Sequence, residues 1–350
     1  MTKRTSIKAL VFATLALMLN ACMPTPDPIP ESFIKQFEEG AYPTKDELLK
    51  ECSDTLEKMP LFYEMSNDYN YCKEYDSSVK LSQVAQKSLD TLMVQINNTD
   101  APTEKDSLNA ALMFAATAGD LKSLNKLLEM GADPNAENAL HMTALMTAAN
   151  SIHPDCVEAL LNAGATPNIQ DAQGLTALML ASNNVLNAQS VRLLIQKGAD
   201  VNIKAKNGST ALLIATQKDC TQSTYDLIKA GADVNVSDPN SGFTPLLFAA
   251  SQCNHLSIQF LVDAGAEVNV KSSLDGVTPI LITASCAHPD SALILLNAGA
   301  NPNISMNNGT SIADIMENRK NDPFPFIDEE DENALQKAVF IARARRLFIF

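Results

Sequence analysis

The stretch Asp171-Ala-Gln-Gly-Leu-Thr-Ala-Leu-Met-Leu-Ala181 opens one copy of a motif that recurs along this chain of 350 residues. Its core, Thr followed by Ala or Pro and then Leu or Ile, begins at Thr143, Thr176, Thr210, Thr244 and Thr278. A second motif, Gly-Ala-x-Pro/Val-Asn, begins 21 or 22 residues after each threonine, and once before the first of them at Gly131. Its six glycines lie 33 or 34 residues apart. Two motifs that keep one register from Gly131 to Gly299 establish an internal repeat.

Each copy has the composition of two short helices. The threonine hydroxyl is placed to cap the first helix, and small residues such as Ala148-Ala149 follow, which lets neighbouring helices pack closely. A pair of large apolar residues such as Leu160-Leu161 comes later, and the glycine then ends the second helix in a left-handed conformation. One helix pair cannot bury its own apolar face, so the copies must stack and share a core.

Both motifs resemble those of the ankyrin-repeat family, and the resemblance covers residues 106–316. It implies an all-α solenoid of helix-turn-helix repeats whose connecting β-turns project as fingers. One difference is systematic, because the histidine that commonly follows Thr-Pro-Leu in the family is replaced by Met146, Met179, Leu213, Leu247 and Leu281. We therefore expect apolar packing in place of the hydrogen bonds that this histidine makes between repeats.

The segments on either side of the array match no repeat. Residues 31–105 predict a small helical cap, with one helix over about 44–58 and another from Ser77 or Ser78 to about residue 95. Five of the six tyrosines lie in this part, and they fit either aromatic packing within the cap or a binding patch. Residues 317–350 predict a C-terminal capping segment whose apolar face closes the stack.

The N-terminus has the pattern of an export signal over residues 1–21. A basic start precedes the apolar stretch Ala9–Leu19, which is too short to span a membrane. The sequence Leu19-Asn-Ala-Cys22 resembles the lipobox of bacterial lipoproteins. The resemblance implies that Cys22 is acylated and that residues 22–30 form a Pro-rich tether. It also implies a lipid-anchored protein of the bacterial cell envelope that faces the periplasm, with the outer membrane favoured. An ordinary secretory signal with a chance cysteine is the alternative.

The composition excludes several classes of protein. At 46% hydrophobic and 19% charged residues, the chain is neither disordered nor fibrous. The 26 basic and 41 acidic residues give a net charge of −15, which repels phosphate backbones and disfavours nucleic-acid binding. The sequence contains no nucleophile elbow, no phosphate-binding Gly-rich loop and no His-Glu-x-x-His motif. We therefore expect neither an enzyme nor a small-molecule substrate.

The cysteines fit an oxidising compartment. Cys52 and Cys72 would close a loop of about 20 residues within the cap, and we expect them to form a disulfide that stabilises it. Cys220, Cys253 and Cys286 lie 33 residues apart in successive loops, and Cys253 is placed to pair with either neighbour.

The same loops offer an alternative as a zinc site. Cys253 and Cys286 each stand two residues before a histidine, and thiolates with imidazoles can supply a tetrahedral zinc shell. Repeats that resemble these often carry a histidine at this turn for structural reasons alone, so we predict no metal and no cofactor.

The family resemblance implies that the partner-binding positions lie just before each threonine and about seven and eight residues after it. In this sequence the finger tips are Leu140, Met142, Leu175, Phe243, Leu274 and Val277. The helical positions include Asn183, Asn184, Gln217, Lys218 and Gln252. We expect Phe243 to be the best anchor, because a large ring on a finger tip has few neighbours to bury it.

Three functions fit this pattern. The first is a tethered protein that binds a protein partner in the periplasm, for example as an inhibitor or immunity factor against a secreted toxin. The second is an envelope stress-support protein, for example one that assists a catalase in oxidative-stress defence. The third is a redox or metal sensor built on the cysteine loops. The acidic charge favours a basic partner in the first case.

Overall fold

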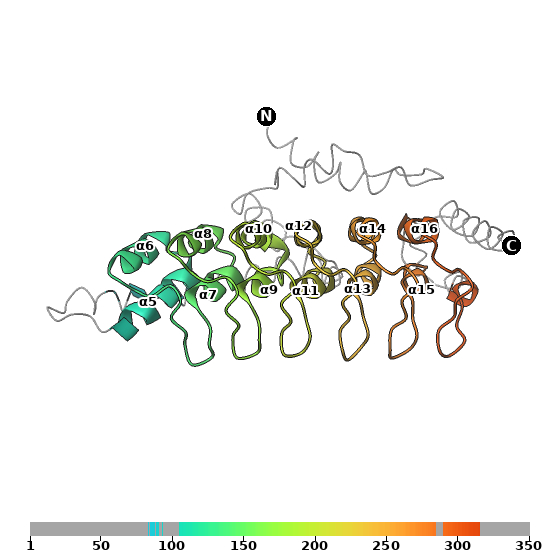
Figure 1. Ribbon diagram of the computed structural model, residues 1–350, viewed down its shortest axis with the longest axis horizontal. Coiled ribbons are helices and arrows are strands. Elements are labelled where there is room, and N and C mark those ends of the chain that lie inside the picture. Colours follow the sequence, from blue (N-terminus) through green and yellow to red (C-terminus); the bar gives the residue numbers. More distant parts are fainter. Residues whose placement is uncertain are drawn as a thin grey trace, which may run out of the picture.

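The computed structural model describes residues 83, 85–87, 89, 90, 93, 105–284 and 290–315. Over these residues the chain forms a row of helix pairs, with one helix of each pair in an inner layer and the other in an outer layer (Figure 1). The inner helices are α5 (Lys105–Ala118), α7 (Ala144–Asn150), α9 (Ala177–Ala181), α11 (Ala211–Gln217), α13 (Pro245–Ser251) and α15 (Pro279–Thr283). The outer helices are α6 (Leu121–Glu129), α8 (Pro154–Asn162), α10 (Ala188–Gln196), α12 (Thr221–Lys229), α14 (His255–Asp263) and α16 (Asp290–Asn297).

The loops between successive pairs all project to one side as fingers (Figure 1). A short 3-10 helix, η2 (Val185–Asn187), precedes α10. In the described part of the chain β-structure is limited to one isolated bridge, between Ser305 and Ser311. None of the described helices has the length and apolar character needed to cross a membrane. The all-α solenoid is therefore confirmed.

The inner helices begin where the threonines predict. The side chains of Thr143, Thr176, Thr210 and Thr244 accept a hydrogen bond from the backbone N–H three residues on, at 3.3–3.4 Å. Thr278 is the exception, since its hydroxyl is buried and makes no such bond. The first repeat has Ala110 at this place, and α5 runs for 14 residues, whereas the later inner helices have five to seven. Without a capping residue there, nothing stops the helix from extending upstream.

The core runs without interruption along the row of repeats. Inner-helix alanines such as Ala148 and Ala149 are fully buried. One outer-helix leucine from every repeat has no exposed surface, and the column is Leu127, Leu160, Leu194, Leu227, Leu261 and Leu295. Burial of each such side chain contributes about 1.5–3 kcal/mol, which ties every repeat to its neighbours.

A column of asparagines joins the repeats on the side where the outer helices end. In each case Nδ2 donates to the carbonyl of the next repeat's glycine at 3.1–3.4 Å, and Oδ1 accepts from a backbone N–H two residues beyond that glycine at 2.7–2.9 Å. The members are Asn135, Asn168, Asn202, Asn235 and Asn269. They are the last residue of the Gly-Ala-x-Pro/Val-Asn motif, so the motif encodes the connection between repeats as well as the helix end.

The turn between the inner and the outer helix contains a left-handed position whose residue type differs from repeat to repeat. Gly119 occupies it in the first repeat with φ +74°, and the same place is taken by Ile152, Asp219 and Cys253 with φ between 53° and 62°. A left-handed conformation costs a residue with a side chain about 1–2 kcal/mol, and most for a β-branched one. The six motif glycines also have positive φ, from 86° to 93°, as predicted for helix ends.

The flanking segments lie almost entirely outside the described residues. This applies to the signal over residues 1–21, the tether over 22–30 and the C-terminal segment over 317–350. The described residues between Gln83 and Met93 are helical, as expected for the second helix of the cap, and Leu89 is fully buried in the common core.

Candidate protein-binding surface

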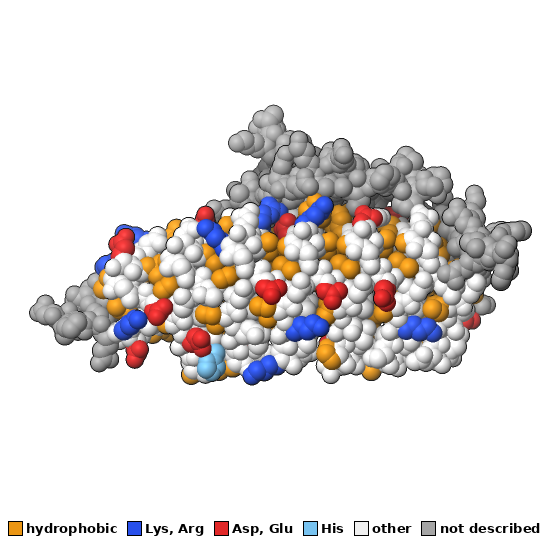
Figure 2. All heavy atoms as spheres, viewed as in Figure 1, with side chains coloured by type: hydrophobic (Ala, Val, Ile, Leu, Met, Phe, Trp, Pro, Cys, Tyr) orange, Lys and Arg blue, Asp and Glu red, His pale blue; other side chains and the backbone are white. Residues whose placement is uncertain are grey.

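The fingers and the exposed ends of the inner helices form one continuous surface, which we call the finger surface. Of the predicted tips, Leu140 and Leu274 are 61% and 71% exposed, whereas Met142, Leu175 and Phe243 are half-buried and pack against the core. Figure 2 shows isolated acidic and basic side chains along these repeats, with hydrophobic groups recurring between them. The face that Figure 2 shows therefore offers scattered apolar contacts between single charges.

Two predicted positions are not available as expected. Val277 is only 8% exposed and belongs to the core, so it presents almost no surface. The Asn184 side chain accepts a hydrogen bond from the Leu186 N–H at 2.9 Å and caps η2, which gives this side chain a local structural role. Asn183, by contrast, is exposed.

Phe243 has a neighbour that the sequence analysis did not anticipate. Its ring centroid lies 5.1 Å from that of Phe248 on α13, with the two planes tilted by 53°. Such an offset pair is favourable beyond the apolar area that it buries. The expectation that Phe243 stands alone on its finger is therefore wrong, and the anchor on this finger is a pair of rings.

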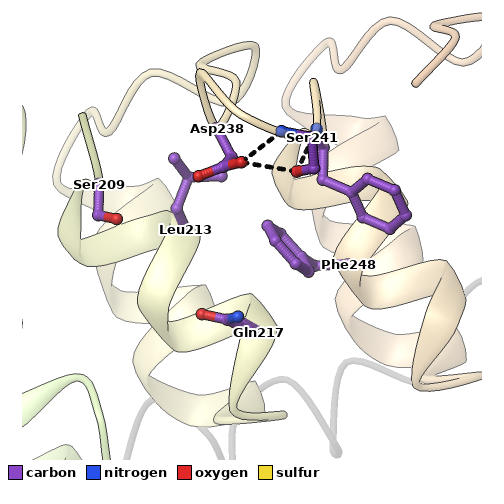
Figure 3. A pocket seen from close by; sticks show the side chains of 7 residues that line it. Ser209, Leu213, Gln217, Asp238, Ser241 and Phe248 are labelled. Carbon is purple, nitrogen blue, oxygen red and sulfur yellow. Dashed lines mark hydrogen bonds between the residues drawn. The ribbon is translucent and has the colours of Figure 1, made fainter. Parts of the chain in front are cut away.

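Phe243 and Phe248 both line a pocket between the fourth and fifth repeats. The pocket has a volume of about 310 Å³, at the lower end of the range for ligand pockets. Leu213 and Gln217 of α11 lie on one side, and the Phe248 ring of α13 points into the space from the other (Figure 3). The remaining lining residues are Ser209, Asp238, Ser241 and Phe243.

Asp238 is the one charged residue among the seven that line the pocket. Its Oδ1 accepts hydrogen bonds from the Ser241 N–H and hydroxyl, both at 2.7 Å, and from the Asn240 N–H at 3.1 Å. The bonds from Ser241, more than that from Asn240, hold the pKa of the Asp238 carboxyl below its usual value of 3.8. The pocket therefore combines an aromatic wall with a fixed negative charge at neutral pH.

Exposed polar side chains lie next to the pocket. Gln217 and Lys218 at the end of α11 are exposed, and so is Gln252 after α13. The Gln252 Nε2 donates to the Gln217 carbonyl at 3.1 Å, so the two predicted contact positions are neighbours across the repeat boundary. The arrangement of an apolar hollow beside polar groups is typical of the centre of a protein interface.

The cysteine loops are only partly described. Cys253 is disulfide-bonded, so its sulfur is not available as a thiolate ligand for zinc. Cys220 is a buried thiol, which means that the expected alternative of a Cys220–Cys253 bridge is not formed. Cys52, Cys72, Cys286 and the acylation site Cys22 lie outside the described residues. Within the described ranges, no three His, Cys, Asp or Glu side chains are grouped so that they could hold a metal ion.

The sequence analysis did not identify the pocket residues that lie outside the repeat motifs. Phe248 is four residues after its threonine, where the other repeats with this threonine carry Thr147, Leu180, Ile214 and Ile282, and where the first repeat carries Phe114. Only Phe114 and Phe248 place a ring at this position in the six repeats, and that difference was the available signal. Asp238 and Ser241 lie in a finger that is one residue longer than those of the preceding repeats. Their hydrogen bond therefore depends on the conformation of the turn in this longer finger.

Comparisons with known proteins agree with this architecture. A family model described as Ankyrin repeats (3 copies) matches four overlapping stretches, residues 112–205, 145–238, 182–272 and 212–306. Among solved structures, the human ASB11 ankyrin repeat domain superposes with a TM-score of 0.53 at 21% identity, over 66% of this chain and 96% of that one. No curated protein sequence matches significantly. Ankyrin repeats generally mediate protein–protein binding, and proteins built from them are typically not enzymes. The stacked helix pairs and the matched stretches together show that this chain belongs to the ankyrin-repeat family.

Proposed function

We propose that this protein binds one protein partner on the finger surface while a lipid on Cys22 anchors it to the membrane, facing the periplasm. In that position it acts as an inhibitor or immunity factor against a secreted toxin. The observation that carries the binding site is the pocket of Phe243, Phe248 and Asp238 between the fourth and fifth repeats. A partner side chain that fills it would bury aromatic surface at the centre of the contact.

Charge supports a basic partner. The whole chain has a net charge of −15, and loss of residues 1–21 would remove three basic residues and no acidic ones, which leaves 23 − 41 = −18. A field of this sign speeds encounter with a basic protein and repels acidic competitors. Asp238 places one of these charges inside the pocket itself.

Site-specific photocrosslinking in cells that produce the full chain tests the binding surface. A photoreactive residue replaces Gln217, which lines the pocket and is exposed. The matched control replaces Glu158, which is exposed on the outer helix α8. We expect one dominant basic protein to be captured from position 217 and not from position 158. Capture of the same proteins from both positions would refute the assignment of the finger surface.

The anchor needs a separate test, because the binding surface does not depend on it. A Cys22→Ser variant is expected to leave the membrane fraction or to remain unprocessed, and to lose incorporation of a labelled fatty acid. Unchanged membrane retention with no label in the wild-type protein would remove the lipid anchor from the proposal and leave the binding surface untouched.

A further inference from the structure

The pocket between the fourth and fifth repeats contains a carboxylate oxygen that the finger does not use. Asp238 Oδ1 accepts the bonds that shape the finger, from the Asn240 N–H and from the N–H and hydroxyl of Ser241, whereas in the described part of the chain Oδ2 accepts none. None of the seven lining residues is basic. Lys206 on the adjacent finger is bonded elsewhere, since its Nζ donates to the Ala172 carbonyl at 2.8 Å. The charge of Asp238 is therefore not neutralised within the pocket.

An aromatic face lies in the same pocket. Phe248 is half-buried, and its ring points into the space between Asp238, Leu213 and Gln217 (Figure 3). The Phe243 ring supports it, with the two centroids 5.1 Å apart. The face of an aromatic ring attracts a cation that lies within about 6 Å of its centre, and arginine is more often found there than lysine. The pocket therefore combines two attractions for one positive group.

The backbone link between neighbouring fingers is missing at this pocket. In four described pairs of fingers, the N–H of the second residue of one finger donates to a carbonyl of the finger before it, at 2.9–3.0 Å. The donors are Ala172, Lys206, Ser273 and Asn307, and the acceptors are Leu140, Gln173, Ser241 and Asp275. The fifth repeat has Pro239 at the donor place, and proline has no N–H. In the described part of the chain the Asn207 carbonyl, at the acceptor place, therefore accepts no hydrogen bond. A second unused acceptor thus lies two residues before Ser209, which lines the pocket.

We propose that this pocket takes an arginine side chain of the partner, an inference that rests on the proposed binding at the finger surface. A guanidinium is flat, so it can stack on the Phe248 ring while an N–H group in its plane donates to Asp238 Oδ2. Arginine has five N–H donors and no acceptor, which suits a site whose unused groups are acceptors. A lysine ammonium is a compact, strongly hydrated charge that cannot stack in this way. The volume of about 310 Å³ suits one side chain better than a larger ligand.

A single capped amino acid tests the pocket without any partner. The probe is Nα-acetyl-arginine amide, added to the purified full chain with labelled leucine methyl groups. The reporter is the methyl NMR signal of Leu213, which lines the pocket; Leu213→Met assigns this signal, since the second and third repeats carry methionine at this place. We expect a saturable shift, with the lysine analogue binding about twofold weaker or more and the uncharged citrulline analogue about fivefold weaker or more. Equal binding of the arginine and citrulline probes, tighter binding of the lysine probe, or no shift of Leu213 would each overturn the proposal.

Asp238→Asn separates the charge from the shape of the finger. The amide oxygen of asparagine can accept the bonds that Oδ1 accepts, while the negative charge is lost. We expect the arginine probe to bind about fivefold weaker or more and the citrulline probe to bind as before. Asp171→Asn is the matched control, because Asp171 Oδ1 accepts equivalent bonds from the N–H groups of Gln173 and Leu175, in a finger that does not line the pocket. An unchanged affinity in Asp238→Asn, or the same loss in both variants, would overturn the role of this carboxylate.

Phe248→Leu tests the ring face. The third repeat carries Leu180 at this place, so the helix accommodates the change. The arginine probe should bind about two- to fivefold weaker, and an unchanged affinity would overturn the stacked arrangement. These probes also separate this inference from the proposed function. Specific capture of a partner from position 217, with no preference for arginine, would overturn the arginine pocket alone. A preference for arginine without such capture would support the pocket and refute the proposed function.

Discussion

The asparagine column provides a direct test of what holds the repeats together. In Asn202→Ala, the array loses the bond from Nδ2 to the Gly231 carbonyl at 3.1 Å and the bond from the Asp233 N–H to Oδ1 at 2.8 Å. A hydrogen bond contributes about 0.5–1.5 kcal/mol net, and water can replace part of each one because Asn202 is exposed. We expect the free energy of unfolding to fall by about 1–2 kcal/mol. For an array of this length the midpoint of thermal unfolding should fall by about 2–8 °C.

The chain supplies its own control in Asn303. This residue ends the same motif in the last described repeat, and its N–H bonds to the Asn301 side chain at 3.1 Å as the Asn202 N–H bonds to Asp200 at 2.9 Å. In the described part of the chain, however, the Asn303 side chain makes no hydrogen bond. Urea unfolding followed by far-UV circular dichroism should show a much smaller loss for Asn303→Ala. Equal losses for the two variants would mean that the asparagines act only within their own turns.

Two further predictions concern buried polar groups. Thr210→Val should lower the free energy of unfolding by about 1 kcal/mol because it removes a helix cap. Thr278→Val should be neutral or stabilising, since the Thr278 hydroxyl is buried without a hydrogen bond. Urea unfolding of the two variants tests this difference. Burial raises the pKa of Asp219 above 3.8, although the Asn254 side chain donates a hydrogen bond to its carboxylate. The charged carboxylate therefore lowers the stability of the folded protein at neutral pH. This loss of stability disappears as the pH falls through the folded-state pKa toward 3.8. Asparagine also tolerates the φ of +58° at this position, so Asp219→Asn should be at least as stable as the wild type at pH 7. Its gain in stability over the wild type should shrink as the pH is lowered. A gain that grew on acidification would contradict the raised pKa of Asp219.

The regular parts of the fold were predictable because each depends on residues close in sequence. A threonine cap needs only the next three residues, and a glycine helix end needs only its own backbone freedom. The Thr278 cap failed although its sequence context matches that of Thr244, so packing around that turn overrides the local preference. The role of the motif asparagine was not predicted, since its partners lie about 30 residues away in the next repeat.

The candidate site was predictable only in part. Family-like spacing predicted Gln217, Gln252 and Phe243 as contact positions, and the structure makes them neighbours or near-neighbours of one pocket. The same spacing included Val277, which is buried because its finger packs onto the core. Whether a side chain at a repeat position is open or covered depends on contacts between repeats, and a one-dimensional register does not contain them.

Two aromatic pairs that depart from the repeat pattern lie in the fourth and fifth repeats. The same two repeats contain the Phe243–Phe248 pair on the finger surface and the Tyr225–Phe260 pair on the outer layer. A solenoid that only had to be stable would not need a large ring such as Tyr225 at a place that the first two repeats fill with the exposed Asn125 and Glu158. Replacing the fourth and fifth repeats with copies of the second should therefore leave a folded array while abolishing both the pocket and the Tyr225–Phe260 pair. A replaced array that kept its partner would place the binding site elsewhere on the finger surface.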